Sequence, residues 1–149
     1  MSKKNVADII RENKTVFIVT ADNGTANGDK GSFAKDVALR VPLVVSGGNV
    51  RALAKPSPVL VDFTDFWPTL ADLAGYEAPA DLHGYSIAPY LRGEDFKPRG
   101  YCRMAMSDAR WIRTRNWLLD GRGHLYDVRN AGSREDYRDV THSDEPEVL

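Results

Sequence analysis

Apolar residues in the first part of the chain form short runs separated by polar, glycine-containing loops. Within residues 4–13, Val6, Ile9 and Ile10 have the i, i+3, i+4 spacing of a short amphipathic helix. An unbroken apolar run over residues 16–19 follows, and such a run is typical of a strand buried on both faces. A helix followed by a buried strand is half of an α/β unit. The pattern therefore predicts an α/β fold with a mainly parallel sheet covered by helices.

Two further short apolar runs, over residues 41–45 and 59–61, predict additional strands. The spacing then changes to that of a helix, which places five large apolar side chains on one helical face: Phe63, Phe66, Trp67, Leu70 and Leu73. Pro68 is tolerated only in a first turn, so this helix should start near residues 62–65. Gly75 suits the position just past its C-terminus. Residues 86–93 predict one or two further helical turns.

The pattern changes again near residue 98. Short strand-like runs follow, and residues 121–123, Gly-Arg-Gly, suit the turn of a hairpin between the last two runs. The sequence after residue 130 is polar. We therefore expect residues 1–97 to form the α/β portion, and residues 98–149 to form a small antiparallel subdomain with a tail.

Composition excludes some classes of protein. The 149 residues carry a formal net charge of −1, which gives no global electrostatic case for nucleic acid. No apolar segment approaches the ~20 residues that span a bilayer. Charges at Asp8, Arg11 and Glu12 interrupt any signal-peptide core, so no leader is expected here and the compartment stays open. The single cysteine, Cys102, excludes an internal disulfide.

The loop at residues 20–32 is the strongest candidate for a site, although a purely structural loop remains an alternative. Its Asn23-Gly24 pair is a hairpin signal, but the next apolar run begins only near Val37. A phosphate-binding P-loop fails because Asp29 and Gly31 break the required motif around Lys30. An EF-hand loop fails because its acidic spacing is not kept.

The position of this loop favours a site for a metal ion and an anion. Ligands in open α/β sheets bind beyond the carboxyl ends of the strands, which is where Asp22 and Asn23 lie in the sequence. Carboxylate and amide oxygens suit a hard cation such as Ca²⁺ or Mg²⁺, and Lys30 offers a mobile cation for a tetrahedral anion. Two oxygen donors are too few for a complete shell, so further ligands would have to come from elsewhere.

An ordered series of motifs resembles the C-terminal half of the sulfatases, in the alkaline-phosphatase-like superfamily. It runs from about residue 5 to residue 140: VFIVTADNG, GDKGS, ALRVPLVVSGG, VLVDFTDFWPTLADLAG, LHGYSIAPYLRG, WIRTRNWLLD and HLYDVRN. The resemblance implies that Asp22 and Asn23 ligate the active-site Ca²⁺, with Mg²⁺ as the alternative, and that Lys30 contacts the sulfate group. It implies packing for the helix near residue 66, so Asp62 and Asp65 are expected to cap it or lie at the surface.

The chain also departs from the sulfatase pattern. Sulfatases make a formylglycine nucleophile from a [CS]-x-P-x-R motif in their N-terminal half, and this sequence contains neither that motif nor an Asp-Asp pair. The resemblance therefore implies a C-terminal fragment of a sulfuric ester hydrolase without a catalytic residue of its own. We expect it to be inactive alone, to need the missing N-terminal half to act on a sulfate ester, and to self-associate through its exposed sheet. A non-catalytic binding remnant and a phosphoester hydrolase of the same superfamily are the alternatives.

Histidines and arginines supply the remaining candidates. His83, His124 and His142 lack metal-ligand spacing and are expected to be structural. Four arginines lie near Trp111 and Trp117: Arg110, Arg113, Arg115 and Arg122. Strand alternation would place Trp111, Arg113 and Arg115 on one face and Ile112 and Thr114 on the other. We expect solvent-facing arginines on an exposed sheet rather than a nucleic-acid surface, and a polyanionic or sulfated substrate would fit them equally well.

Overall fold

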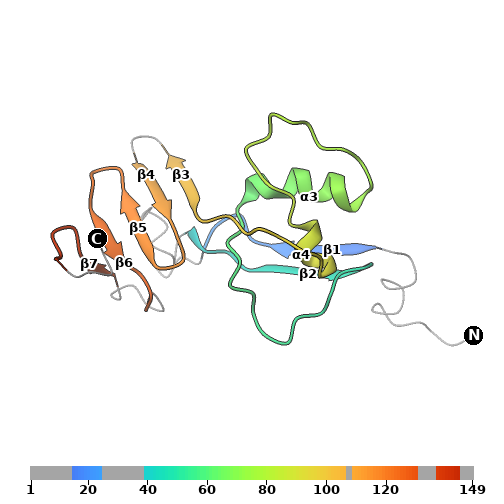
Figure 1. Ribbon diagram of the computed structural model, residues 1–149, viewed down its shortest axis with the longest axis horizontal. Coiled ribbons are helices and arrows are strands. Elements are labelled where there is room, and N and C mark those ends of the chain that lie inside the picture. Colours follow the sequence, from blue (N-terminus) through green and yellow to red (C-terminus); the bar gives the residue numbers. More distant parts are fainter. Residues whose placement is uncertain (1–14, 25–38, 107–108, 131–136, 145–149) are drawn as a thin grey trace, which may run out of the picture. The chain divides into compact units, whose positions relative to one another are not determined.

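The computed structural model describes residues 15–24, 39–106, 109–130 and 137–144 (Figure 1). Contacts divide the chain into two compact units, Met1–Thr20 with Pro42–Pro98 and Ala21–Val41 with Arg99–Leu149. The helix expected within residues 4–13 and the Lys30 side chain lie outside the described residues. No helix in the described ranges is long and apolar enough to cross a membrane.

The first unit contains a two-stranded sheet, formed by β1 (Val16–Thr20) and β2 (Leu43–Gly47). The strands are antiparallel, with Ile18 opposite Val45, so the described residues do not confirm a mainly parallel sheet. A continuous apolar run predicts burial, but it carries no information on strand direction. One face of the pair is also open, because Phe17, Val19 and Val44 are 44%, 58% and 56% exposed.

Two helical segments cover the other face of this strand pair. They are η1 (Phe63–Asp65), which continues into α3 (Phe66–Leu73), and α4 (Ala88–Arg92). A narrow apolar pocket lies between the strands and the helices, and it is lined by Ile18, Leu43, Val45, Phe66, Thr69, Ile87 and Leu91. No described strand forms over residues 59–61.

The ends of the helix agree with the sequence prediction, whereas its apolar face is only partly buried. Asp62 is the N-cap of η1, Pro68 lies in the first turn of α3, and Gly75 adopts a positive φ of 78° just past the C-terminus. Phe66 lines the apolar pocket, but Trp67 and Leu70 are 60% and 46% exposed. The helix thus presents apolar side chains on two sides.

The second unit contains a five-stranded antiparallel sheet in the order β3-β4-β5-β6-β7 (Figure 1). Its strands are β3 (Cys102–Met106), β4 (Ala109–Arg113), β5 (Trp117–Asp120), β6 (Leu125–Asp127) and β7 (Arg138–Asp139). The turn between β5 and β6 contains Gly123, whose φ of 90° favours glycine. The small antiparallel sheet and the hairpin at residues 121–123 are therefore confirmed.

The core of the second unit lies on one face of this sheet. Trp111, Leu118 and Val128 are buried there, with Met104, Tyr126 and Tyr137 packed against them. The arginines expected to face solvent do so at Arg110, Arg115 and Arg122, which are exposed. Arg113 is instead half-buried beside Trp111, which is 7% exposed, whereas Ile112 on the opposite face is 44% exposed. Alternation correctly grouped Trp111 with Arg113, but it could not indicate which of the two faces is covered.

Candidate functional site

The predicted metal ligands, Asp22 and Asn23, lie two and three residues after Thr20, the last residue of β1. The Asn23 backbone N–H donates to Asp22 Oδ1 at 2.9 Å, and Asn23 Nδ2 donates to the Gly24 carbonyl oxygen at 2.8 Å. The second bond engages the amide nitrogen of Asn23 and leaves its side-chain oxygen as the acceptor. Asp22 is exposed and Asn23 is half-buried. The two neighbouring side chains therefore offer one carboxylate and one amide oxygen from a locally ordered turn.

This donor set fits part of the shell of a hard cation. Ca²⁺ takes about six to eight oxygen ligands, and Mg²⁺ takes six in octahedral geometry, both commonly from carboxylate and amide oxygens. Within the described ranges, no three or more His, Cys, Asp or Glu side chains gather as a metal cluster. Asp22 and Asn23 thus offer the type of ligand atom that the metal prefers, but too few of them for a complete shell. Their role and that of Lys30 stay predictions.

Asp62 and Asp65 cap the helix, as expected. The Thr64 backbone N–H donates to Asp62 Oδ1 at 2.9 Å, and the Asp62 N–H donates to Asp65 Oδ2 at 3.0 Å. The sequence did not reveal a second role of Asp65, whose Oδ1 accepts the Tyr85 N–H at 2.8 Å. Asp65 is completely buried. Its carboxylate therefore fixes both the start of the helix and a loop twenty residues further along.

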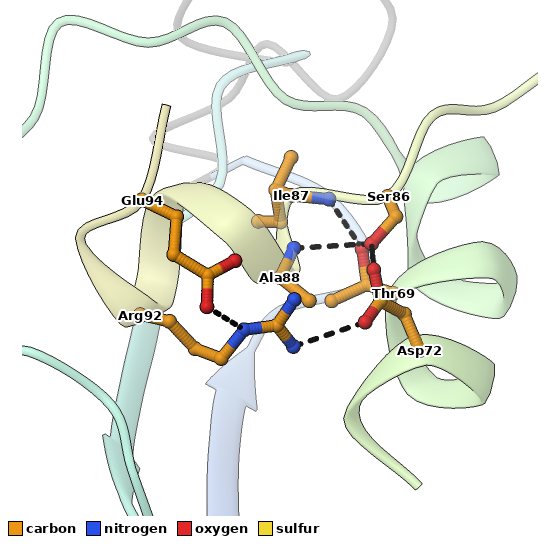
Figure 2. Close-up of polar contacts among 7 residues, drawn as sticks. All are labelled: Thr69, Asp72, Ser86, Ile87, Ala88, Arg92 and Glu94. Carbon is orange, nitrogen blue, oxygen red and sulfur yellow. Dashed lines mark hydrogen bonds and ion pairs between the residues drawn. The ribbon is translucent and has the colours of Figure 1, made fainter. Parts of the chain in front are cut away.

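A polar network joins α3 to α4 (Figure 2). Thr69 Oγ1 accepts the Ile87 N–H at 3.0 Å, and Ser86 Oγ donates to Asp72 Oδ2 at 2.7 Å. Arg92 donates to Asp72 Oδ1 from Nη1 at 2.9 Å. Burial raises the pKa of Asp72, but the hydrogen bonds from Ser86 and Arg92 outweigh it and hold that pKa below its usual value. The network fastens the two helices together and leaves Asp72 ionised.

The histidines do not form a catalytic or metal-binding group with one another in the described part of the chain. His83 is exposed. His124 Nδ1 lies 3.0 Å from Asp120 Oδ2 across the turn between β5 and β6, where the Asp120 carboxylate also accepts the backbone N–H of Arg122. These contacts stabilise a hairpin turn and give His124 a structural role.

Asp127 is the centre of a compact charge cluster at the end of β6. Arg129 donates to its carboxylate from Nε at 3.0 Å and from Nη2 at 2.7 Å, and Arg138 Nη2 lies 3.4 Å away. The hydrogen bonds from Arg129 are the largest cause that holds the pKa of Asp127 far below its usual value. The Arg129 guanidinium also lies over the Trp117 ring, 5.3 Å from its centroid. The cluster ties β6 to β7 and to β5.

Asp127→Asn is expected to remove part of the acid sensitivity of the fold. Because the folded-state pKa is depressed, the ionised Asp127 stabilises the fold above the ordinary aspartate pKa of about 4, and this contribution is lost as the pH falls toward the folded-state pKa. Urea midpoints from pH 7 down to about pH 2 should therefore fall less steeply in the variant. Asp95→Asn, at an exposed site, is the control, and equal slopes for all three proteins would contradict the prediction.

Much of the chain is similar to known sulfatases. It is 34% identical to the ulvan-active sulfatase of Formosa agariphila over 97 residues, which are 64% of this chain and 19% of that protein. It is 35% identical to human arylsulfatase K over 88 residues, 56% of this chain and 16% of that protein. A solved 2-O GAG sulfatase superposes with a TM-score of 0.67 at 28% identity, covering 78% of this chain and 30% of that one.

The chain is similar to sulfatases in sequence and in fold. No protein-family model matches it, so this similarity rests on the related sequences and on the shared fold. The relatives confirm the resemblance carried by the ordered motifs, and they favour a sulfatase over the alternatives weighed for the sequence. The chain spans about a fifth or less of the length of these two curated sulfatases.

Proposed function

We propose that this chain supplies part of the active site of a sulfuric ester hydrolase. The observation that carries the proposal is the Asp22–Asn23 pair, which presents two oxygen donors just past the end of β1 in a chain similar to sulfatases. The substrate proposed is a sulfate ester, and each of the sulfatase relatives is consistent with that class.

Three residues of the chain would have distinct tasks. Asp22 and Asn23 would hold the Ca²⁺ or Mg²⁺ ion, and Lys30 would bind a sulfate oxygen through its ammonium group. The bound cation would neutralise the negative charge that develops on the sulfate oxygens. Formylglycine, the nucleophile of the family, would come from the N-terminal half of a sulfatase, because this sequence lacks [CS]-x-P-x-R. The chain alone would bind and orient without completing the reaction.

Exposed apolar surface on the first unit supports a partner of this kind. The open face of the β1–β2 pair carries Phe17, Val19 and Val44, and the outer side of α3 carries Trp67 and Leu70. Apolar surface of this sort is normally buried against other protein. We propose that the N-terminal half covers this surface and contributes further strands beside β1 and β2. Residues 1–97 would then belong to a mainly parallel sheet, and residues 98–149 would form the appended subdomain. Without that half, the same surface would favour self-association.

Reconstitution tests the proposal. The isolated chain is compared with the same chain fused behind a sulfatase N-terminal half that carries the formylglycine motif and the paired aspartates. Both are expressed with the formylglycine-forming activity and assayed with an aryl sulfate in the presence of Ca²⁺. We expect turnover only from the fused protein, and inhibition of that turnover by a chelator. A fusion whose own N-terminal half is mutated at the nucleophile is the matched control.

Two outcomes would contradict the proposal. Robust aryl-sulfate hydrolysis by the isolated chain would show that it does not depend on a second half. A folded, formylglycine-containing fusion that hydrolyses an aryl phosphate in preference to the aryl sulfate would assign the site to phosphoester chemistry instead.

A further inference from the structure

The turn after β1 contains an asparagine that is followed by a glycine. Asn23 is half-buried and Gly24 is buried, while the neighbouring Asp22 is exposed, so solvent reaches the turn. Glycine has no Cβ, and its backbone nitrogen is therefore less crowded than that of any other residue. The Gly24 nitrogen is also placed by the chain so that it can close a succinimide ring on the side-chain carbonyl carbon of Asn23. The turn thus holds a nucleophile and an electrophile in adjacent residues.

Hydrogen bonds in the turn favour the approach of these two groups. Asn23 Nδ2 donates to the Gly24 carbonyl oxygen at 2.8 Å, so the side-chain amide folds forward over the peptide group that would attack it. The Asn23 backbone N–H donates to Asp22 Oδ1 at 2.9 Å. Among the described residues, by contrast, no acceptor is found for the Gly24 N–H. The attacking nitrogen therefore has no described hydrogen bond to break before it loses its proton.

Two other asparagines, Asn49 and Asn116, provide a comparison within the same chain. Both are exposed, so exposure alone would make them the more reactive residues. Each precedes a bulky residue whose side chain crowds the attacking nitrogen. Each of those nitrogens also donates a hydrogen bond, Val50 N–H to the Gly47 carbonyl oxygen at 3.1 Å and Trp117 N–H to Thr114 Oγ1 at 3.0 Å. The state of the attacking nitrogen therefore favours reaction at Asn23.

We propose that Asn23 is a site of spontaneous deamidation through a succinimide formed with Gly24. The Gly24 nitrogen bonds to Asn23 Cγ as the Cγ–Nδ2 bond breaks, and Nδ2 leaves as ammonia with the proton that the Gly24 nitrogen loses. Solvent water, which is the co-reactant, then adds to one of the two ring carbonyls. Addition at Cγ yields aspartate. Addition at the backbone carbonyl yields isoaspartate, in which the main chain continues through the former side chain.

Either product changes the candidate metal site. Aspartate replaces a neutral amide with a second carboxylate beside Asp22, and isoaspartate lengthens the backbone of the turn and moves its oxygen atoms. The reaction itself requires neither a metal ion nor sulfate-ester hydrolysis. This inference therefore goes beyond the proposed function, and its test uses neither.

Peptide mapping of the full chain after incubation at mildly alkaline pH with EDTA tests the inference. Mass spectrometry with electron-based fragmentation locates each amide-to-acid change and distinguishes aspartate from isoaspartate, and circular dichroism verifies that the chain stays folded. We expect Asn23 to convert about tenfold faster than Asn49 or Asn116, because the nitrogen of glycine is the least crowded. Both aspartate and isoaspartate should appear at position 23.

Matched glycine variants show whether the Gly24 nitrogen is the attacking group. Gly24→Ala should slow conversion of Asn23 about tenfold, because the added Cβ crowds that nitrogen. Gly28→Ala makes the same change at a second Asn-Gly pair, Asn27–Gly28, which lies outside the described residues, and should leave the rate at Asn23 unchanged. An equal rate at Asn23 in a folded Gly24→Ala chain would overturn the proposal. Conversion no faster than at Asn49 and Asn116, or conversion confined to a chain unfolded in urea, would overturn it as well.

Discussion

Asp22→Ala is expected to lower kcat/KM of the reconstituted sulfatase by about 10² to 10³. The expectation follows from the proposed role of the carboxylate, since losing one preorganised electrostatic contact at an active site typically costs this much. Asp22 is exposed and its carboxylate accepts the backbone N–H of the adjacent Asn23, so its removal should leave the fold intact. Steady-state hydrolysis of an aryl sulfate as a function of Ca²⁺ concentration is the measurement.

The dependence on Ca²⁺ distinguishes a ligand from a structural residue. If Asp22 holds the ion, the variant should need a higher Ca²⁺ concentration for half-maximal activity, and excess Ca²⁺ should restore part of the rate. Asp95→Ala removes an exposed carboxylate elsewhere and should change neither quantity. An Asp22→Ala enzyme with a reduced rate but an unchanged Ca²⁺ requirement would refute the assignment of Asp22 as a ligand.

Gly84→Ala is expected to destabilise the first unit by about 3 kcal/mol or more, at the upper end of what overpacking costs. A Cβ at this position would collide with the Thr64 carbonyl group and would lie 2.7 Å from the Asp65 nitrogen. Those atoms are backbone at the start of the helix, so they cannot move aside as a flexible side chain could. The shift needed would also strain the hydrogen bond from the Tyr85 N–H to Asp65. Chemical denaturation of the full chain, followed by circular dichroism, measures the loss.

Gly100→Ala provides the matched control for this substitution. A Cβ on Gly100 would meet nothing within 4 Å, and its backbone shows no positive φ. The control should therefore unfold within about 0.5 kcal/mol of the starting chain, as surface substitutions usually do. If Gly84→Ala were as stable as Gly100→Ala, this result would contradict the close contact between the Gly84 backbone and the start of the helix.

Local signals in the sequence predicted the helix ends and the hairpin well. The cap at Asp62, the first-turn Pro68 and the positive φ of Gly75 follow from the chemistry of those residues in any context. The same is true of the turn at residues 121–123. Each of these features depends on neighbours in the chain, so a sequence pattern carries them directly.

Features set by distant contacts could not be predicted in the same way. The residues of β1 indicate a strand, but its direction relative to β2 is set by the connection between them and by the elements that cover the sheet. The alternation around Trp111 likewise groups side chains without showing which group is covered. For the candidate site, the sequence supplied Asp22 and Asn23, whereas the rest of a coordination shell depends on residues that no local pattern contains.

The two oxygens of Asp65 couple local and long-range order. One accepts the Asp62 N–H at the start of η1, and the other accepts the Tyr85 N–H from beyond the end of α3. Closing the intervening segment costs conformational entropy. Burying the Asp65 carboxylate costs desolvation free energy once, whereas the buried group then makes two stabilising hydrogen bonds. Helix nucleation and loop closure should therefore be one cooperative event, so this helix is specified by residues on both sides of it.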